Sequence, residues 1–210
     1  MRQRATLLTH VTPAVFEAFD LDGFVVVPGA LDAQTLTELS RAFDDAPAQT
    51  TGTQHVAIGE QTPAREAWEA LKTHPWLQAT AKHLLGSAFH VRDVHGRNPL
   101  PGYGLQGLHA DWTELPAGSP YVILTTLWMI DGFSPNNGST RVVPGTHRAL
   151  RSVPREMAQP TSRHPDERQV TGAPGSVLFL NGHTWHSGTL NRSQGPRRAV
   201  QLIVQRGAAP

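Results

Sequence analysis

Length, composition and charge limit what this protein can be. Its 210 residues are 39% hydrophobic and 17% charged, which predicts a folded chain with a sizeable core. A formal net charge of +1 gives no general attraction to nucleic acid or to an anionic membrane surface. Cysteine is absent, which excludes disulfide bonds and thiol catalysis, and no apolar run is long enough for a transmembrane helix. The first ten residues hold no apolar stretch of signal-peptide length, so we expect, by elimination, a cytoplasmic protein.

The first 90 residues predict a mainly helical stretch that contains one strand. Residues 15–19 form an amphipathic helical turn, and the apolar run Phe24–Val27 ends at Pro28-Gly29, as a strand does. Asp32 is a candidate N-cap for a helix whose apolar side chains share one face. These side chains are Leu36, Leu39 and Phe43.

The rest of this stretch divides into a polar segment and a second helical region. Residues 50–61 are polar and contain glycine, which predicts a loop or a flap. Residues 63–85 predict a helix that is broken near His74-Pro75, because a residue before proline is disfavoured in the helical conformation.

Residues 91–210 predict a β-rich region. Short apolar runs alternate with Gly/Pro turns, a pattern typical of a sandwich or barrel. The predicted strands are residues 89–94, 121–130, 140–143, 175–180 and 199–204. Residues 160–172 are polar without an apolar period and predict a surface loop. We expect one domain over residues 1–210, since no repeat or low-complexity segment divides it.

Two short segments carry the residue types of a metal centre. His109-Ala110-Asp111 places an imidazole and a carboxylate two residues apart, so on a strand or at its end both point to the same face. A second imidazole, from His186, follows much later in Trp185-His186-Ser187-Gly188. Two neutral imidazoles and one carboxylate are the ligand set of a non-haem Fe(II) facial triad, which leaves open positions on the metal. The sequence therefore predicts iron ligation by His109, Asp111 and His186.

The ordered set of motifs resembles the phytanoyl-CoA dioxygenase family of Fe(II)/2-oxoglutarate oxygenases. The resemblance begins at residues 22–29 and continues through the His109/Asp111 pair and residues 136–147. It ends at Trp185–Gly188 and Arg197. It implies a mainly β fold with helices, in which a double-stranded β-helix of the jelly-roll or cupin type carries N-terminal helices on one sheet.

Residue roles follow from the resemblance. His109, Asp111 and His186 match the family's iron ligands, and Arg197 matches the arginine that binds the far carboxylate of 2-oxoglutarate. A guanidinium suits that task because it presents a rigid fork of donors to a carboxylate. Trp128 matches an aromatic beside the co-substrate. Gly188 stands where some relatives carry a hydroxyl, so the co-substrate would lose one contact there.

The implied reaction uses Fe(II), 2-oxoglutarate and O2 and releases succinate and CO2, usually with hydroxylation of the substrate. Asp111 favours hydroxylation, desaturation, epoxidation or ring formation, because related halogenases have no carboxylate at this position. Lysine occurs only at Lys72 and Lys82, so no basic entrance for the phosphates of CoA stands out. We expect a small-molecule substrate, an amino acid or an intermediate of secondary metabolism, and neither nucleic acid nor membrane as a partner. The sequence carries no signal for the oligomeric state.

Alternatives stay open at this level. His183 competes with His186 as the third ligand, and Arg198 competes with Arg197, although neighbours on a strand point to opposite faces. A zinc-dependent hydrolase or cupin-like isomerase would use the same ligands without 2-oxoglutarate, but it leaves Arg197 without a task. A non-catalytic binding protein of the same fold is disfavoured by the presence of all four key residues. We expect solvated surface positions for Arg92, Arg97 and Gln106, and a turn-ordering role for His147.

Overall fold

The computed structural model describes residues 12–47, 49–57, 65–113, 115 and 120–207. The helices are α1 (Pro13–Asp22), α2 (Ala33–Asp44), α3 (Arg65–Lys72), α4 (Pro75–Leu85) and the 3-10 helix η1 (Thr146–Ala149). The strands are β1 (Phe24–Val27), β2 (Thr53–Ala57), β3 (Phe89–Pro99), β4 (Ile123–Met129), β5 (Thr140–Val143), β6 (Arg168–Gln169), β7 (Val177–Asn181), β8 (Trp185–Gly188) and β9 (Ala199–Arg206). Among these residues, no helix combines the length and the apolar character that crossing a bilayer requires.

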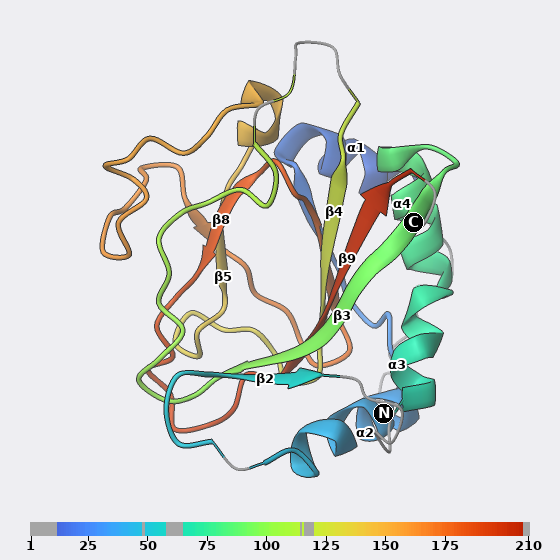
Figure 1. Ribbon diagram of the computed structural model, residues 1–210, viewed down its shortest axis with the longest axis vertical. Helices are drawn as coiled ribbons and strands as arrows, with labels where there is room; N and C mark the ends of the chain where they lie inside the picture. Colours follow the sequence, from blue (N-terminus) through green and yellow to red (C-terminus); the bar gives the residue numbers. More distant parts are fainter. Residues whose placement is uncertain (1–11, 48, 58–64, 114, 116–119, 208–210) are drawn as a thin grey trace, which may run out of the picture.

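Two antiparallel sheets form the body of the protein. The larger sheet has the strand order β1-β7-β4-β9-β3-β2, and the smaller has the order β6-β5-β8. Figure 1 shows α3 and α4 along one side of β3, β4 and β9, with β5 and β8 on the other side. This arrangement is the double-stranded β-helix, with helices packed on one sheet, that the family resemblance implies.

Alternate residues of the central strands supply two separate cores. On β4, Trp128 packs in the cluster between the larger sheet and the helices, whereas Leu127 and Met129 pack in the cluster between the sheets. On β7, Phe179 lies on the helix side and Leu178 on the inner side. Because side chains two apart share a face of a strand, one set anchors the helices and the other set surrounds the barrel interior.

Most predicted elements are confirmed. β1 spans the predicted apolar run, and the Asp32 side chain caps α2 by accepting a hydrogen bond from Thr35 N at 2.7 Å. The helical region after residue 65 breaks at His74, which is followed by Pro75 at the start of α4. The five predicted strands of the β-rich region correspond to β3, β4, β5, β7 and β9.

Two segments predicted as loops contain strands. Within residues 50–61, Thr53–Ala57 forms β2 and pairs with β3; residues 58–61 lie outside the described part of the chain. Within residues 160–172, Arg168–Gln169 forms β6 and pairs with β5. Both strands lie at sheet edges, where one side of the strand has no neighbour and polar residues are favoured. Their sequences therefore lack the apolar pattern of an inner strand.

Gly96 lets the helices pack closely on β3. A Cβ at this position would lie 2.5 Å from Phe43 Cζ and 2.8 Å from Trp68 Cη2. We expect Gly96→Ala to lower the free energy of unfolding by about 1–3 kcal/mol through overpacking, as measured by urea denaturation. Gly195→Ala is the matched control, because its Cβ would meet nothing within 4 Å. An equal loss of stability in both variants would contradict this account of Gly96.

Candidate active site

The side chains of His109, Asp111 and His186 converge in one cavity of the barrel. One ligand atom from each lies within 4.8 Å of the others, and His186 Nε2 is 3.6 Å from Asp111 Oδ1. Within the described part of the chain, no other group of His, Cys, Asp and Glu side chains meets this spacing. The structure thus brings together the three residues that the sequence singles out.

Backbone pairing holds the two histidines side by side. His109 N donates to His186 O at 2.9 Å, and His186 N donates to His109 O at 2.8 Å. Asp111 N donates to Gly182 O at 2.8 Å, which fixes the chain at the third residue. The segment of residues 108–111 therefore runs antiparallel to the start of β8, and both ligand-bearing segments are positioned by main-chain bonds.

Each imidazole is oriented by a backbone carbonyl. His109 Nδ1 lies 3.0 Å from Gly107 O, and His186 Nδ1 lies 2.8 Å from Thr184 O. Since a carbonyl only accepts, Nδ1 carries the hydrogen and Nε2 keeps a lone pair for a metal. Burial, assisted by His186, lowers the pKa of His109, which favours the neutral form that metal ligation requires.

A hydroxyl orients the carboxylate. Thr125 Oγ1 donates to Asp111 Oδ2 at 2.5 Å, while Oδ1 is the oxygen that faces His186. Thr125 lies on β4 and lines the same cavity. One carboxylate oxygen is therefore held by the protein, and the other stays available to a metal.

Arg197 lies in this cavity with an unsatisfied donor. Its side chain is buried, its Nε has no hydrogen-bond partner, and its Cζ lies 4.6 Å from the centre of the Phe133 ring. Burial, with Arg97 acting in the same direction, lowers the pKa of Arg197 to about 9. An unpaired buried cation is unfavourable, so the cavity suits an anionic ligand. Arg198 points elsewhere, and its Nε and Nη2 donate to the two carboxylate oxygens of Asp131 at 3.0 Å.

Arg97 and Gln106 line the cavity as well, so the expectation that they lie on the solvated surface is wrong. Arg97 Nη1 donates to Gln201 Oε1 at 3.0 Å, and burial lowers the pKa of Arg97 while Asp111 opposes that shift. An arginine on a mostly polar strand carries no local sign of burial. The signal that could identify the inward position of Arg97 is the alternation of side chains along β3, read together with the pairing of β3 with β9. Arg92 is exposed, as predicted.

The structure does not place Trp128 in the cavity with the candidate ligands, so its assignment beside the co-substrate is wrong. Trp128 is fully buried on the helix side, where Nε1 donates to Thr126 Oγ1 at 3.0 Å and the ring packs against Phe179. Its neighbour Leu127 lines the cavity instead. Because successive side chains alternate between the faces of a strand, an error of one position exchanges the two environments.

Gly188 has no room for a side chain. A Cβ there would lie 2.6 Å from Gly104 O and 3.0 Å from Gln106 Oε1. Gln106 Oε1 accepts a hydrogen bond from Gly188 N at 3.1 Å. The space in which a hydroxyl would stand is thus filled by the segment that leads to His109.

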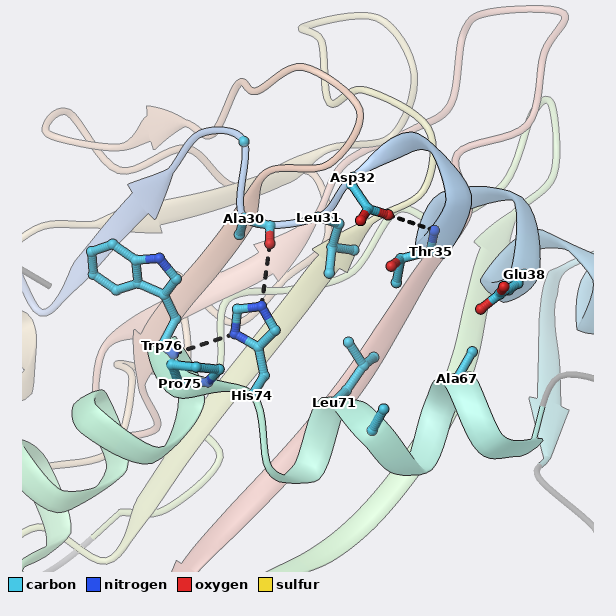
Figure 2. Close-up of a pocket in the computed structure, with 12 residues that line it drawn as sticks. Ala30, Leu31, Asp32, Thr35, Glu38, Ala67, Leu71, His74, Pro75 and Trp76 are labelled. Atoms are coloured by element: carbon cyan, nitrogen blue, oxygen red, sulfur yellow. Dashed lines mark hydrogen bonds between the residues drawn. The ribbon is translucent and has the colours of Figure 1, made fainter. Parts of the chain in front are cut away.

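A larger cavity of about 340 Å³ lies on the helix side, between α2, α3 and the start of α4. Figure 2 shows His74 at its base, with Nε2 donating to Ala30 O and Nδ1 accepting from Trp76 N. The His74 ring also meets the edge of Trp128 at 4.7 Å between centroids. None of the candidate ligands lines this cavity, so it is separate from the cavity that contains them.

His183 and His147 lie outside the ligand cluster. His183 Nε2 accepts a hydrogen bond from Val122 N at 3.3 Å, and its ring packs near Tyr121. His147 is the second residue of η1, and its Nε2 lies 3.2 Å from Asp20 O. The structure therefore places His186, and not His183, beside His109 and Asp111.

The fold and the cavity together define a class of enzyme, the 2-oxoglutarate-dependent non-haem iron dioxygenases. The chain belongs to the phytanoyl-CoA dioxygenase (PhyH) family, whose sequence profile matches residues 19–199.

Relatives and solved structures agree with this membership. Dioxygenase FrzG of Cladobotryum sp is 26% identical over an alignment that covers 86% of this chain and 69% of FrzG. Dioxygenase andF of Emericella variicolor is 28% identical, covering 60% of this chain and 45% of andF. HygX from Streptomyces hygroscopicus, solved with nickel, 2-oxoglutarate and hygromycin B, superposes with a TM-score of 0.77 at 19% identity, covering 93% of this chain and 88% of HygX. The carbocyclase SnoK from nogalamycin biosynthesis gives 0.71 at 20% identity, covering 96% and 86%. The two solved structures show that the fold is shared.

The hydrogen bond from Thr125 to Asp111 predicts weaker metal binding when it is removed. We expect Thr125→Val to lower the affinity for Fe(II) by about 10-fold or more, as second-sphere losses do, when measured by anaerobic titration. Thr125→Ser is the matched control, because it keeps the hydroxyl and should bind nearly as wild type. Equal affinities in the two variants would show that this bond does not orient the carboxylate.

The buried His183 predicts a loss of stability in acid. Burial lowers its pKa from an ordinary value of 6.5 to about 4, so between these values the unfolded chain binds a proton that the folded chain does not. Stability therefore falls as the pH drops through this window, by up to about 3 kcal/mol from this group. Urea unfolding at pH 7 and pH 5 should show a smaller pH dependence in His183→Gln than in the wild type. An identical dependence would refute the assignment.

Proposed function

We propose that this protein hydroxylates a small metabolite, with Fe(II) held by His109, Asp111 and His186 and with 2-oxoglutarate bound by Arg197. One observation carries the proposal: a single cavity contains the three candidate ligands together with a buried arginine whose Nε has no partner. A zinc hydrolase or a cupin-like isomerase would need the ligands but not the arginine.

The cavity complements both ends of 2-oxoglutarate. Three protein ligands on one face leave open metal positions to which the 2-oxo acid end can chelate. Arg197 supplies a fork of donors for the other carboxylate, and that anion would compensate the buried cation. Arg97 adds a second positive charge to the same cavity, close enough to Asp111 for the two to interact electrostatically.

The residues around the candidate ligands fix the orientation of the ligand side chains. When bound, iron with 2-oxoglutarate and O2 supplies an oxidation that releases succinate and CO2 and places one oxygen on a substrate C–H bond. Thr125 and the two carbonyls at Gly107 and Thr184 keep the ligands in one orientation, which preorganises the site. As a ligand, Asp111 would supply a carboxylate where related halogenases have none, which favours hydroxylation over halogenation.

The substrate class rests on several weaker supports. Most of the residues that line the cavity carry polar side chains, among them Thr53, Thr140 and Gln201 besides those already named. Only two lysines occur in the chain, which disfavours a site for the phosphates of CoA. Solved structures of similar fold include a protein with hygromycin B bound and enzymes of nogalamycin biosynthesis. We infer an amino acid or a natural-product intermediate as substrate, one catalytic domain over residues 1–210, and action in the cytoplasm.

The reaction itself is tested by product analysis. The purified protein is incubated with Fe(II), 2-oxoglutarate, O2 and a panel of amino acids and natural-product intermediates. We expect succinate in proportion to a product that is heavier by one oxygen, and neither in His186→Ala. A product formed without oxygen and without 2-oxoglutarate would instead support the hydrolase or isomerase alternative.

Arg197 is tested separately by co-substrate binding. We expect Arg197→Gln to raise the Kd for 2-oxoglutarate by about 10- to 100-fold, because hydrogen bonds between charged groups contribute about 1.5–3 kcal/mol. Calorimetric titration of Ni(II)-loaded protein measures this change, and the affinity for Ni(II) should stay the same. The matched control is Arg198→Gln, whose arginine pairs with Asp131 outside the cavity. A loss confined to the Arg198 variant would move the role to that residue.

A further inference from the structure

Arg141 of β5 is a buried cation outside the cavity that holds the candidate ligands. Its side chain is 2% exposed, and its charged partner among the described residues is Glu167, whose Oε2 lies 3.0 Å from Nη1. Nε donates to Ser187 Oγ at 2.6 Å. The terminal nitrogens also donate to the carbonyls of Gln106, Pro160 and Ser162. Five hydrogen bonds thus match the five N–H groups of the guanidinium.

Two of these bonds reach the segments that carry the histidines. Ser187 directly follows His186 on β8, and Gln106 lies three residues before His109. Gln106 is itself joined to β8, because its N donates to Gly188 O at 3.1 Å and its Oε1 accepts from Gly188 N at 3.1 Å. Arg141 therefore ties both histidine-bearing segments together from outside the cavity.

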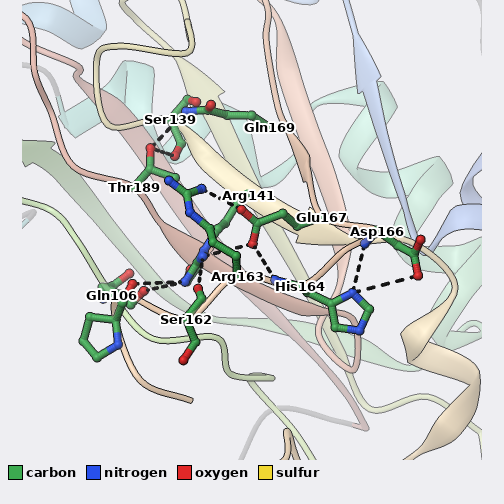
Figure 3. Close-up of polar contacts among 12 residues, drawn as sticks. Gln106, Ser139, Arg141, Ser162, Arg163, His164, Asp166, Glu167, Gln169 and Thr189 are labelled. Carbon is green, nitrogen blue, oxygen red and sulfur yellow. Dashed lines mark hydrogen bonds and ion pairs between the residues drawn. The ribbon is translucent and has the colours of Figure 1, made fainter. Parts of the chain in front are cut away.

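A third segment, residues 150–167, packs against the same two segments. Gly107 fits so closely beneath it that a Cβ would lie only 1.7 Å from Ala158 O. Trp185 Nε1 donates to Arg151 O at 3.2 Å. Val153 and Met157 pack on the small cluster of Leu108, Val143 and Trp185. Figure 3 shows Arg141 between Gln106 and two residues of this segment, Ser162 and Glu167.

We propose that Arg141, held by Glu167, is a positioning residue that sets the separation of His109 and His186 for metal binding. The proposal rests on the proposed function in one respect, since it takes these two histidines as ligands. A guanidinium reaches acceptors on several sides at once, whereas an ammonium offers its donors from a single point. Lysine at position 141 would therefore keep the charge but release one or more of the three segments.

The test compares variants of this ion pair with a matched control. Arg141→Lys and Glu167→Gln each weaken the connection to the histidine segments. Arg163→Gln is the control, because Arg163 also pairs with Glu167, at 2.6 Å, yet its side chain is 67% exposed. Among the described residues, Arg163 bonds to Glu167 and not to either histidine segment. We measure the affinity of each purified protein for Co(II) and the visible ligand-field spectrum of the Co(II) site, at a temperature where circular dichroism shows a folded chain.

We expect Arg141→Lys and Glu167→Gln to bind Co(II) about 10- to 100-fold more weakly, with an altered spectrum, and Arg163→Gln to match the wild type. A purely stabilising ion pair would lower the melting temperature but leave the spectrum and affinity of the folded protein unchanged, and that result would overturn the proposal. If Arg141→Lys does not fold, Glu167→Gln alone tests the proposal: weaker Co(II) binding with an altered spectrum supports it, and unchanged affinity and spectrum overturn it. His186→Ala distinguishes a failure of the ligand assignment from a failure of the role of Arg141. Wild-type Co(II) affinity in His186→Ala would refute the ligand assignment, independently of the results for the Arg141 variants.

Discussion

The structure of the site depends on one backbone pairing, in which His109 and His186 exchange two main-chain hydrogen bonds. This pairing joins the segment before β4 to the start of β8, and it sets the two imidazoles at 4.5 Å between ring centroids. Once the pair is formed, the spacing of two residues brings Asp111 to the same face, and the carbonyls at Gly107 and Thr184 select the tautomer that exposes Nε2. Side-chain chemistry at the centre is therefore a consequence of sheet register. The hydrogen bonds of Arg141 reach the same two segments, at Ser187, which follows His186, and at Gln106, three residues before His109.

Charge inside the barrel is the second constraint. Arg97 and Arg197 lie in one cavity with Asp111, and burial lowers the pKa of both arginines. Among the described residues, Asp111 is the one carboxylate that lines the cavity with these two cations, and Asp131, which also acts on Arg197, is paired with Arg198. A buried excess of positive charge is costly unless an anion joins it. A ligand with two acidic ends meets this requirement at the metal and at Arg197. Arg198, which has Asp131 as a partner, needs no such ligand.

Sequence reasoning succeeded where the signal is local. The apolar run of β1, the Asp32 cap and the break at Pro75 are properties of a few adjacent residues, and the His-x-Asp spacing is decided by the alternation of a single strand. It failed where the partner strand or loop decides the outcome. Trp128 and Leu127 exchange faces with a shift of one residue, the edge strands β2 and β6 lack an apolar pattern, and the burial of Arg97 depends on β9 lying beside it. The sequence gives no sign that Arg141 is buried, because three of its partners come from residues 160–167, a segment whose sequence predicts only a surface loop.

The proposed function requires that one cavity binds iron and 2-oxoglutarate together. The most direct measurement is an anaerobic titration of the purified metal-free protein with Fe(II) and 2-oxoglutarate, followed by visible absorption. We expect a weak metal-to-ligand charge-transfer band that appears only when both are present, because the band requires that the 2-oxo acid chelates the iron. If iron is demonstrably bound but no such band appears at saturating 2-oxoglutarate, the two do not bind together in this cavity.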